Sequence, residues 1–389
     1  MTSALSTISL VAGPLAPETA LQTLPLALVF YFQGLGNALM PREVRTLGRR
    51  GAYLVGTCFG VLGNVVIALA CWSQSFVLLC LGACLEGCAM AHAQNYRFGA
   101  VLFLPSNPPK AISYVLFGGC IGALFGPGVL ARARNLLPPD FAGIYALCAL
   151  CHCVGALLLS RIQFPPEGVQ QGVGAQAAQV PPRSLKDIYR NPRCCVGTVA
   201  VAAAYTIMML VMAPTPIVMR MDYGHSYDAA TLVMMGHTFL MYVPSPVTGK
   251  LISRFGALPV ALGGCVMIVV TCATLWSGTS LGFFIAGLVF LGVAWNLLFM
   301  AGTAQLVSCY TKAEGPKVQA FSDGLCFLLS GTSSLLSMTV VRGIGWQITQ
   351  LLAICFSVVT AAIIVTPLAL DAVSSRAQGR LVKEVPSIA

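Results

Sequence analysis

Charged residues are scarce in this sequence. Only 34 of the 389 residues (12 acidic and 22 basic) are charged, which is 9%, whereas soluble globular proteins usually contain about 25%. Apolar residues make up 57% of the chain, and its mean hydropathy is +0.83. So few charged side chains cannot cover a water-soluble fold of 40.8 kDa. The composition therefore predicts a protein whose solvent is lipid, and it excludes most soluble enzymes and nucleic-acid-binding proteins.

The sequence also lacks the motifs of several membrane activities. It has no glycine-rich loop of the kind that binds nucleotide phosphates, which argues against a pump driven by ATP. No cluster of His, Asp or Cys has catalytic spacing at a membrane face, so we expect no enzyme. The Cys-x-x-Cys-His pattern at 148–152 matches a haem attachment motif, but it lies inside an uninterrupted apolar run. We therefore expect no metal and no cofactor.

Long apolar runs dominate instead. A hydrocarbon core about 30 Å thick requires roughly 20 helical residues. Eleven runs of that kind cover residues 20–40, 51–72, 75–98, 111–131, 141–161, 195–218, 229–249, 257–277, 280–303, 318–341 and 346–370. They are too long for the strands of a membrane barrel, so the predicted fold class is an all-α membrane protein with eleven full spans. The short apolar segment Leu5–Val11 is interpreted as the end of a truncated first span or as an interfacial stub.

The basic residues indicate the orientation. If successive loops alternate between the two sides, 18 of the 22 Lys and Arg lie on one side and 4 on the other. The positive-inside rule assigns the basic side to the cytoplasm. The net charge of +10 is thus explained mostly by topology. We expect a multi-pass integral membrane protein, with the plasma membrane as its default location.

A linker divides the apolar runs into two sets. The chain between Gln163 and Asn191 is rich in Pro, Gly and Gln. We therefore predict an N-terminal bundle at 1–162, a cytoplasmic linker at 163–192, a C-terminal bundle at 193–370 and a cytoplasmic tail at 371–389. The halves resemble each other at an offset of 207 to 208 residues: MPREVRTLGRR at 40–50 aligns with TGKLISRFGAL at 248–258, and PPKAISYVLFG at 108–118 with GPKVQAFSDGL at 315–325. Parallel repeats of this kind are typical of transporters.

Several segments resemble the major facilitator superfamily of transporters. The short basic loop at 41–50 and its copy at 249–258 are similar to the gating loop of that family, through Arg45, Arg49, Arg50, Gly249, Arg254 and Gly256. The segment GCIGALFGPG at 119–128 is similar to the glycine-proline signature of its proton-driven antiporters, and QNYRFGA, GHSYDAATLVMMGH and AWNLLFMAGT resemble one branch of it. In the family loop an acidic residue precedes the Arg. This chain has Arg45 and Ser253 there, and only Glu43 lies nearby.

The resemblance implies two pseudo-symmetric six-helix bundles. It also implies a secondary transporter that moves a small solute by alternating access, with coupling to protons as an option. The expected partners are the solute, the lipid bilayer and, if they drive transport, protons; the expected oligomeric state is a monomer. A membrane sensor or scaffold that keeps the fold without transport is the alternative, favoured by the incomplete first span and the missing loop acids.

Polar side chains inside the spans are the candidate site, because an ionisable group at the bilayer centre costs at least ~2.5 kcal/mol and must face protein or water. In the span 75–98, Glu86 and Arg97 are eleven positions apart and return to within about 20° on one face, so one polar stripe could line a cavity. The candidates for the substrate or proton pathway are Glu86, His92, Asn95, Arg97, His237, Trp295, Asn296 and Asp323.

Each candidate also has a purely structural explanation. A buried Glu or His is explained by hydrogen bonds between helices, an Arg near a span end by contact with headgroups, and Asp323 by the dipole at the start of its helix. Trp295 and Asn296 fit solute binding and packing equally well. Finally, glycines that repeat every four residues predict a close helix contact followed by a bend; they are Gly118, Gly122 and Gly126, with Pro127 after them.

Overall fold

The computed structural model describes residues 2–104, 114–115, 118–119, 121–122, 125–126, 128–129, 132–165, 182–311 and 314–383, with the backbone alone at 2–6, 97, 98, 101, 316 and 367–383. All regular structure in these ranges is helical. The helices are α1 (Thr2–Leu15), the 3-10 helix η1 (Thr19–Leu21), α2 (Leu24–Ser73), α3 (Phe76–Val101), α5 (Ala142–Arg161), α6 (Leu185–Tyr189), α7 (Pro192–Met212), α8 (Thr215–Met221), α9 (Tyr227–Tyr242), α10 (Ser245–Phe255), α11 (Ala257–Ser277), α12 (Leu281–Val307), α13 (Gly315–Ile344) and α14 (Trp346–Lys383).

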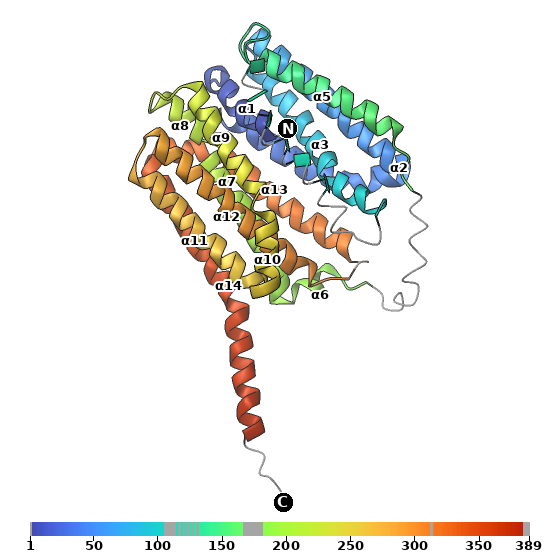
Figure 1. Ribbon diagram of the computed structural model, residues 1–389, viewed down its shortest axis with the longest axis vertical. Coiled ribbons are helices and arrows are strands. Elements are labelled where there is room, and N and C mark those ends of the chain that lie inside the picture. The colour runs from blue at the N-terminus through green and yellow to red at the C-terminus, as the bar shows by residue number, and fades with distance from the viewer. Residues whose placement is uncertain are drawn as a thin grey trace, which may run out of the picture.

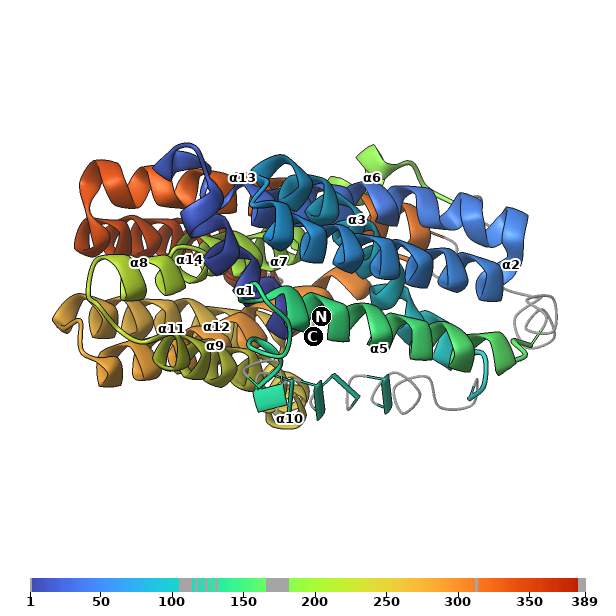
Figure 2. The ribbon, with the colours of Figure 1, turned by 90° about the horizontal axis from the view of Figure 1, so that it is seen from above.

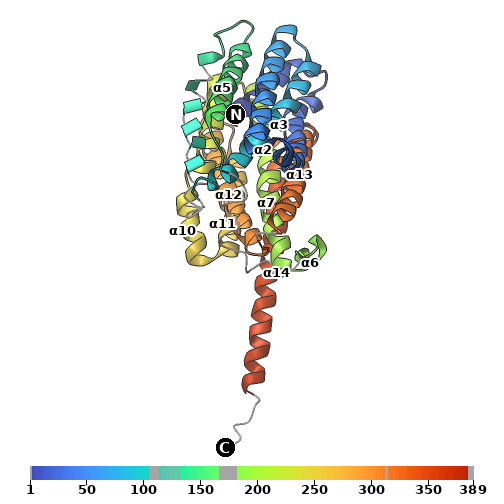
Figure 3. The same ribbon diagram turned by 90° about the vertical axis from the view of Figure 1, so that its right-hand side faces the viewer.

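These helices form two groups that lie side by side (Figures 1 and 2). In the first group, α2 packs against α3 and α5. In the second, α12 packs against α7, α9 and α11, while α14 packs against α7 and α11. The groups meet where α13 lies against α2 and where α1 lies against α8 and α9. Helix α14 continues beyond the other helices toward the C-terminus (Figures 1 and 3).

Two glycines make equivalent turns in the two groups. Gly48 interrupts α2 with φ 70° and ψ 168°, and Gly256 separates α10 from α11 with φ 85° and ψ 168°. This backbone region is essentially restricted to glycine, because a Cβ would clash there. The two positions differ by 208 residues, which agrees with the offset between the repeated segments. Both basic loops therefore reverse the chain in the same way.

The number of spans differs from the eleven expected. Among the described residues, eight helices are long and apolar enough to cross a membrane. The expected spans 20–40 and 51–72 are counted together because both lie in the element α2, although the non-helical backbone at Gly48 separates this element into two helices. The expected span 229–249 is divided after Tyr242, where Pro244 stands between α9 and α10 and cannot donate a helical hydrogen bond. Most of the expected span 111–131 lies outside the described residues.

Glycines of α2 provide the close helix contacts of the first group. A Cβ added to Gly56 would lie 2.3 Å from the Cβ of His92 on α3, and one added to Gly60 would lie 2.3 Å from the His152 ring on α5. A Cβ on Gly63 would lie 2.9 Å from the backbone nitrogen of Glu86. Small residues at such positions let helix backbones approach within a membrane. They bring three titratable side chains of α3 and α5 against α2.

The glycines for which we predicted a close contact behave differently. A Cβ on Gly118 or Gly122 would meet no atom within 4 Å among the described residues. Both glycines and Gly126 instead line a cavity, and Pro127 lies outside the described residues. The expected close contact is therefore not found at Gly118 or Gly122 in the part of the chain that the structure describes.

Candidate functional site

Glu86 is held by an amide inside the first group of helices. Its side chain is only 4% exposed, and Oε2 accepts a hydrogen bond of 2.7 Å from Nδ2 of Asn64 on α2. Asn64 Nδ2 also donates to the carbonyl oxygen of Gly60, one turn earlier, at 2.8 Å. The backbones can approach this closely because Gly63 faces the start of that turn of α3. Asn64 is a part of the site that sequence reasoning missed, although it is a rare polar residue in the run 51–72.

His92 pairs with the acidic residue of the first basic loop. Its Nε2 lies 2.6 Å from Oε2 of Glu43, and its Nδ1 lies 2.8 Å from the carbonyl oxygen of Cys88. Each ring nitrogen of His92 therefore lies within hydrogen-bond distance of an oxygen, one from Glu43 and one from the backbone. The acidic position of the family pattern is occupied by Arg45 in this chain, and Glu43 supplies an acid two positions earlier in the same loop.

The third polar residue of α3, Asn95, bonds to the first half of α2, before Gly48. Asn95 Nδ2 donates to Oδ1 of Asn37 on α2 at 3.1 Å and to the carbonyl oxygen of Ala91 at 2.9 Å. The side chain of Arg97 lies outside the described residues. Glu86, His92 and Asn95 each take a partner on α2. These three side chains therefore form a seam between α3 and both halves of α2.

A cavity of about 810 Å³ opens beside this seam. It lies between α2, α3, α5 and the described part of 114–129, and Glu86 is the only acidic residue among the described residues that line it. Apolar and aromatic side chains form most of the wall, and Thr57, Tyr96 and His152 add polar groups. Glu86 therefore faces both a fixed amide and open space.

A cluster of six aromatic residues lies where the two groups meet. We define the aromatic cluster as Phe30, Tyr205, Tyr242, Trp295, Phe299 and Phe327. The rings of Trp295 and Phe299 are nearly parallel (10°) with centroids 4.7 Å apart, and the Tyr205 ring stands edge-on to both, at 5.2 and 5.8 Å. Tyr205 also contacts Phe327 at 5.9 Å, and Phe327 lies 6.4 Å from Phe30 of α2. The cluster therefore connects α7, α12 and α13 with the opposite group.

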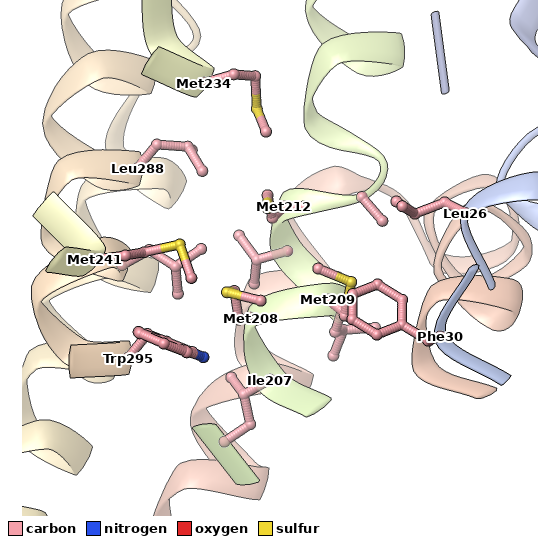
Figure 4. Close-up of a cluster of buried hydrophobic side chains, with 14 of the residues drawn as sticks. Leu26, Phe30, Ile207, Met208, Met209, Met212, Met234, Met241, Leu288 and Trp295 are labelled. Atoms are coloured by element: carbon pink, nitrogen blue, oxygen red, sulfur yellow. The ribbon is translucent and has the colours of Figure 1, made fainter. Parts of the chain in front are cut away.

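Methionines surround this cluster. Figure 4 shows Met208, Met209 and Met212 of α7 between Trp295 on one side and Phe30 on the other. Met234 and Met241 of α9 complete the buried wall beside α12 (Figure 4). Methionine side chains are unbranched and polarisable, so they repack around differently shaped neighbours at low cost. The region thus combines rigid rings with an adaptable apolar surround.

Neighbouring candidates on α12 have different environments. Trp295 belongs to the aromatic cluster and is 4% exposed. The amide of Asn296 donates to the carbonyl oxygen of Met241 at 2.8 Å and to Oγ of Ser245 at 2.9 Å, and accepts from Oγ1 of Thr248 at 2.6 Å. Asn296 therefore stabilises the break between α9 and α10, because its bonds satisfy polar groups on both sides of Pro244.

The remaining candidates of the second group, His237 and Asp323, are not members of the aromatic cluster. His237 is fully buried, and its Nδ1 lies 2.9 Å from the carbonyl oxygen of Leu288, which joins α9 to α12. Asp323 is half-buried and lies eight residues after Gly315, where α13 begins. The helix-dipole explanation of Asp323 is therefore wrong, because that effect is confined to the first turn.

The basic loops are mainly exposed. Arg45, Arg50 and Arg254 are exposed, and Arg49 is half-buried. The guanidinium of Arg254 lies 5.3 Å from the centre of the Phe255 ring. Gly249 has open space around it, and Gly256 makes the turn described above.

The end of the linker is anchored to the second group by an interaction that sequence reasoning missed. Arg183 donates from its backbone N, Nε and Nη2 to the carboxylate of Glu314, each at 2.9 Å, and from Nη2 to the carbonyl oxygen of Cys309. Hydrogen bonds from Arg183 and from the backbone of Thr311 hold the pKa of the Glu314 carboxyl well below its usual range. Lys317 donates to the carbonyl oxygen of Arg183. The two main partners are 131 residues apart, so no local pattern reveals them.

The sequence of this chain is similar to those of several bacterial transporters. No family model matches the chain. It is 32% identical over 340 residues to the riboflavin transporter RfnT of Brucella anthropi, covering 87% of this chain and 84% of that protein. It is 26% identical over 371 residues to the uncharacterised MFS-type transporter YdeG of Bacillus subtilis, covering 92% and 86%. The MFS-type transporter YddS of the same organism is 26% identical over 355 residues, covering 88% and 81%.

A solved structure has the same fold. The xylose transporter XylE from E. coli, in a partially occluded inward-open conformation, superposes with a TM-score of 0.69 over 93% of this chain and 95% of that chain, at 13% identity. The similarity at this identity concerns the fold. Together with the relatives, it establishes an integral multi-pass membrane protein and not an enzyme. The chain belongs to the major facilitator superfamily of transporters.

Proposed function

We propose that this protein moves riboflavin, or a flavin closely similar to it, across the membrane by alternating access. The relative with 32% identity over 84% of its own length is named a riboflavin transporter, and this supports the substrate class. The aromatic cluster is the observation in this chain that carries the proposal. Riboflavin combines a planar tricyclic ring with a flexible polyol, so its site needs flat aromatic surfaces and a few polar groups.

The position of the aromatic cluster supports binding between the bundles. Trp295 and Phe299 form a parallel pair, and Tyr205 stands edge-on beside them. A flavin ring would stack on such surfaces or replace part of them, in the way that planar bases bind aromatic side chains. Because Phe30 belongs to the opposite bundle, a ligand here would contact both bundles. Such contacts would link binding to their relative movement.

Glu86 is our candidate for a proton site that couples to this movement. A carboxyl group inside a span is costly unless it is paired or used in transport. The Asn64 amide that donates to Glu86 can hydrogen-bond to the carboxyl in either protonation state. The adjoining cavity gives space for water to reach it. Transport of flavin would remain possible in exchange mode without proton movement, so the two parts of the proposal can be tested separately.

Solute counterflow tests the main proposal. Purified protein is reconstituted in liposomes loaded with unlabelled riboflavin, and uptake of external tritiated riboflavin is measured. Protein-free liposomes and ribitol, which has the polyol without the ring, are the controls. We expect protein-dependent uptake that is reduced by excess lumichrome, which has the ring without the polyol, and unaffected by ribitol. Absence of counterflow would contradict transport, and binding without counterflow would favour the sensor alternative.

A further inference from the structure

A cationic side chain lies against two aromatic rings of opposite bundles, which also contact each other, at the end of the molecule away from the linker. Arg134 and Phe141 belong to the turn that precedes α5, and α5 leads from there to the linker. Tyr227 is the first residue of α9. The guanidinium carbon of Arg134 lies 4.2 Å from the centre of the Tyr227 ring and 5.1 Å from that of Phe141. The two rings meet edge-to-face at 5.3 Å.

The turn holds Arg134 in this position. Its Nη2 donates to Oδ2 of Asp140 at 2.7 Å, and its carbonyl oxygen accepts from the backbone nitrogen of Phe141 at 3.1 Å. Phe141 has a φ of 74°, a left-handed conformation that is unfavourable for a bulky residue. Such strain persists only where surrounding contacts maintain it, and it occurs often at switch regions. Here it directs the Phe141 ring toward Tyr227 of the opposite bundle.

Other contacts between the bundles lie in the same half of the molecule. Gln22 Nε2 approaches Sδ of Met221 at 3.9 Å, at the end of the molecule away from the linker, which the basic residues predict to be the non-cytoplasmic end. Thr23 donates to the carbonyl oxygen of Leu335, and α1 packs against α8 and α9. The aromatic cluster lies deeper in the molecule, between these contacts and the linker side. Arg134 and the two rings therefore stand between the candidate binding region and the non-cytoplasmic side.

We propose that Arg134, Phe141 and Tyr227 form the outer gate of this transporter. Their contact closes the solute path on the non-cytoplasmic side and breaks when the bundles separate there. The interaction between a cation and aromatic rings is suited to this purpose, because it is strong enough to hold a conformation and weak enough to break during each transport cycle. The gate depends on the transporter fold and not on which solute is carried.

Hydrogen exchange measured by mass spectrometry on the full-length reconstituted protein tests the proposal. Tyr227→Leu removes the ring, Arg134→Gln removes the charge from the other bundle, and Tyr227→Phe keeps an aromatic face for Arg134. Arg342→Gln is the matched control. Arg342 donates to Asp222 at 2.7 Å at the same end of the molecule, but both residues belong to the second bundle.

We expect Tyr227→Leu and Arg134→Gln to increase the open fraction at residues 134–141 and 222–231 by about 2- to 30-fold. This is the change expected when one interaction between a cation and an aromatic ring is lost. Exchange at the cytoplasmic ends of α2 and α3 should decrease at the same time, because opening on one side accompanies closing on the other. The double variant should match the single variants, since they break one contact. Tyr227→Phe and Arg342→Gln should behave like the unmodified protein.

Three results would overturn the proposal. Unchanged exchange in Tyr227→Leu and Arg134→Gln would show that the contact does not hold the outer end closed. Exchange that increases at both ends would indicate simple loosening of the fold. An effect of Tyr227→Phe as large as that of Tyr227→Leu would show that the aromatic face is not what Arg134 requires.

Discussion

Replacing Trp295 by Leu should weaken riboflavin binding while the fold is kept. The Trp295 ring has Phe299 parallel to it at 4.7 Å and two tyrosines edge-on, at 5.2 Å for Tyr205 and 6.0 Å for Tyr242. Leu retains an apolar side chain but removes the central flat surface. Loss of one stacking side chain costs about 1 to 3 kcal/mol. At about 1.4 kcal/mol per tenfold change, the Kd for riboflavin should rise by roughly 5- to 150-fold.

Flavin fluorescence provides the assay for this variant. Purified protein is titrated into riboflavin, and the quenching caused by stacking gives the Kd. Trp295→Phe should have an intermediate Kd because a smaller ring remains. Trp346→Leu is the control, since Trp346 is also buried and lies against a ring, that of Phe284 at 5.8 Å, but outside the aromatic cluster. A folded Trp295→Leu protein with the original Kd, or an equal loss in Trp346→Leu, would refute the reasoning.

Three further predictions concern coupling, the loops and the linker. Glu86→Gln should abolish the dependence of riboflavin uptake on a pH gradient while counterflow persists; an unchanged gradient dependence would remove Glu86 from the coupling mechanism. Gly256→Ala should lower the free energy of unfolding by about 1 to 3 kcal/mol, because the φ of 85° at this position is unfavourable for alanine. Gly249→Ala should leave the stability unchanged or raise it slightly, because Gly249 lies within α10 with open space around it. Thermal unfolding compares the two variants, and equal effects would contradict the strain argument. Because the pKa of Glu314 is lowered, the stability from its pairing with Arg183 is present above the ordinary carboxyl pKa and is lost only as the pH falls through the lowered value. Protease cleavage at 182–190 should therefore be equally slow at pH 7 and pH 5 and faster at both in Glu314→Gln, and a clear increase at pH 5 in the unmodified protein would disprove this.

Much of the fold was predictable because lipid imposes a simple requirement on the sequence. Apolar runs of about 20 residues mark helices, and the chain confirms an all-α membrane protein of the expected family. The count of spans differs from the expected one at two described places. Two expected spans lie within the one element α2, on either side of Gly48, and Pro244 divides another expected span into α9 and α10. Hydropathy averages over a single proline and therefore does not detect the second break.

The candidate site was predictable only in part, because residue type does not reveal the partner. The helical period predicts a stripe with Glu86 and Arg97 on one face of α3, but it does not predict that the partners of Glu86, His92 and Asn95 all lie on α2. Trp295 and Asn296 looked equivalent in the sequence, but successive helical residues point about 100° apart and reach different neighbours. Tertiary packing decides which polar residue joins helices and which faces a cavity.

The most direct test of the account is a structure of the purified protein with riboflavin bound. We predict density for the flavin ring at the aromatic cluster, in contact with Trp295 or Phe299 of one bundle and with α2 of the other. Flavin density in the cavity beside Glu86, or no flavin density at a saturating concentration, would contradict the claim that the solute binds between the two bundles.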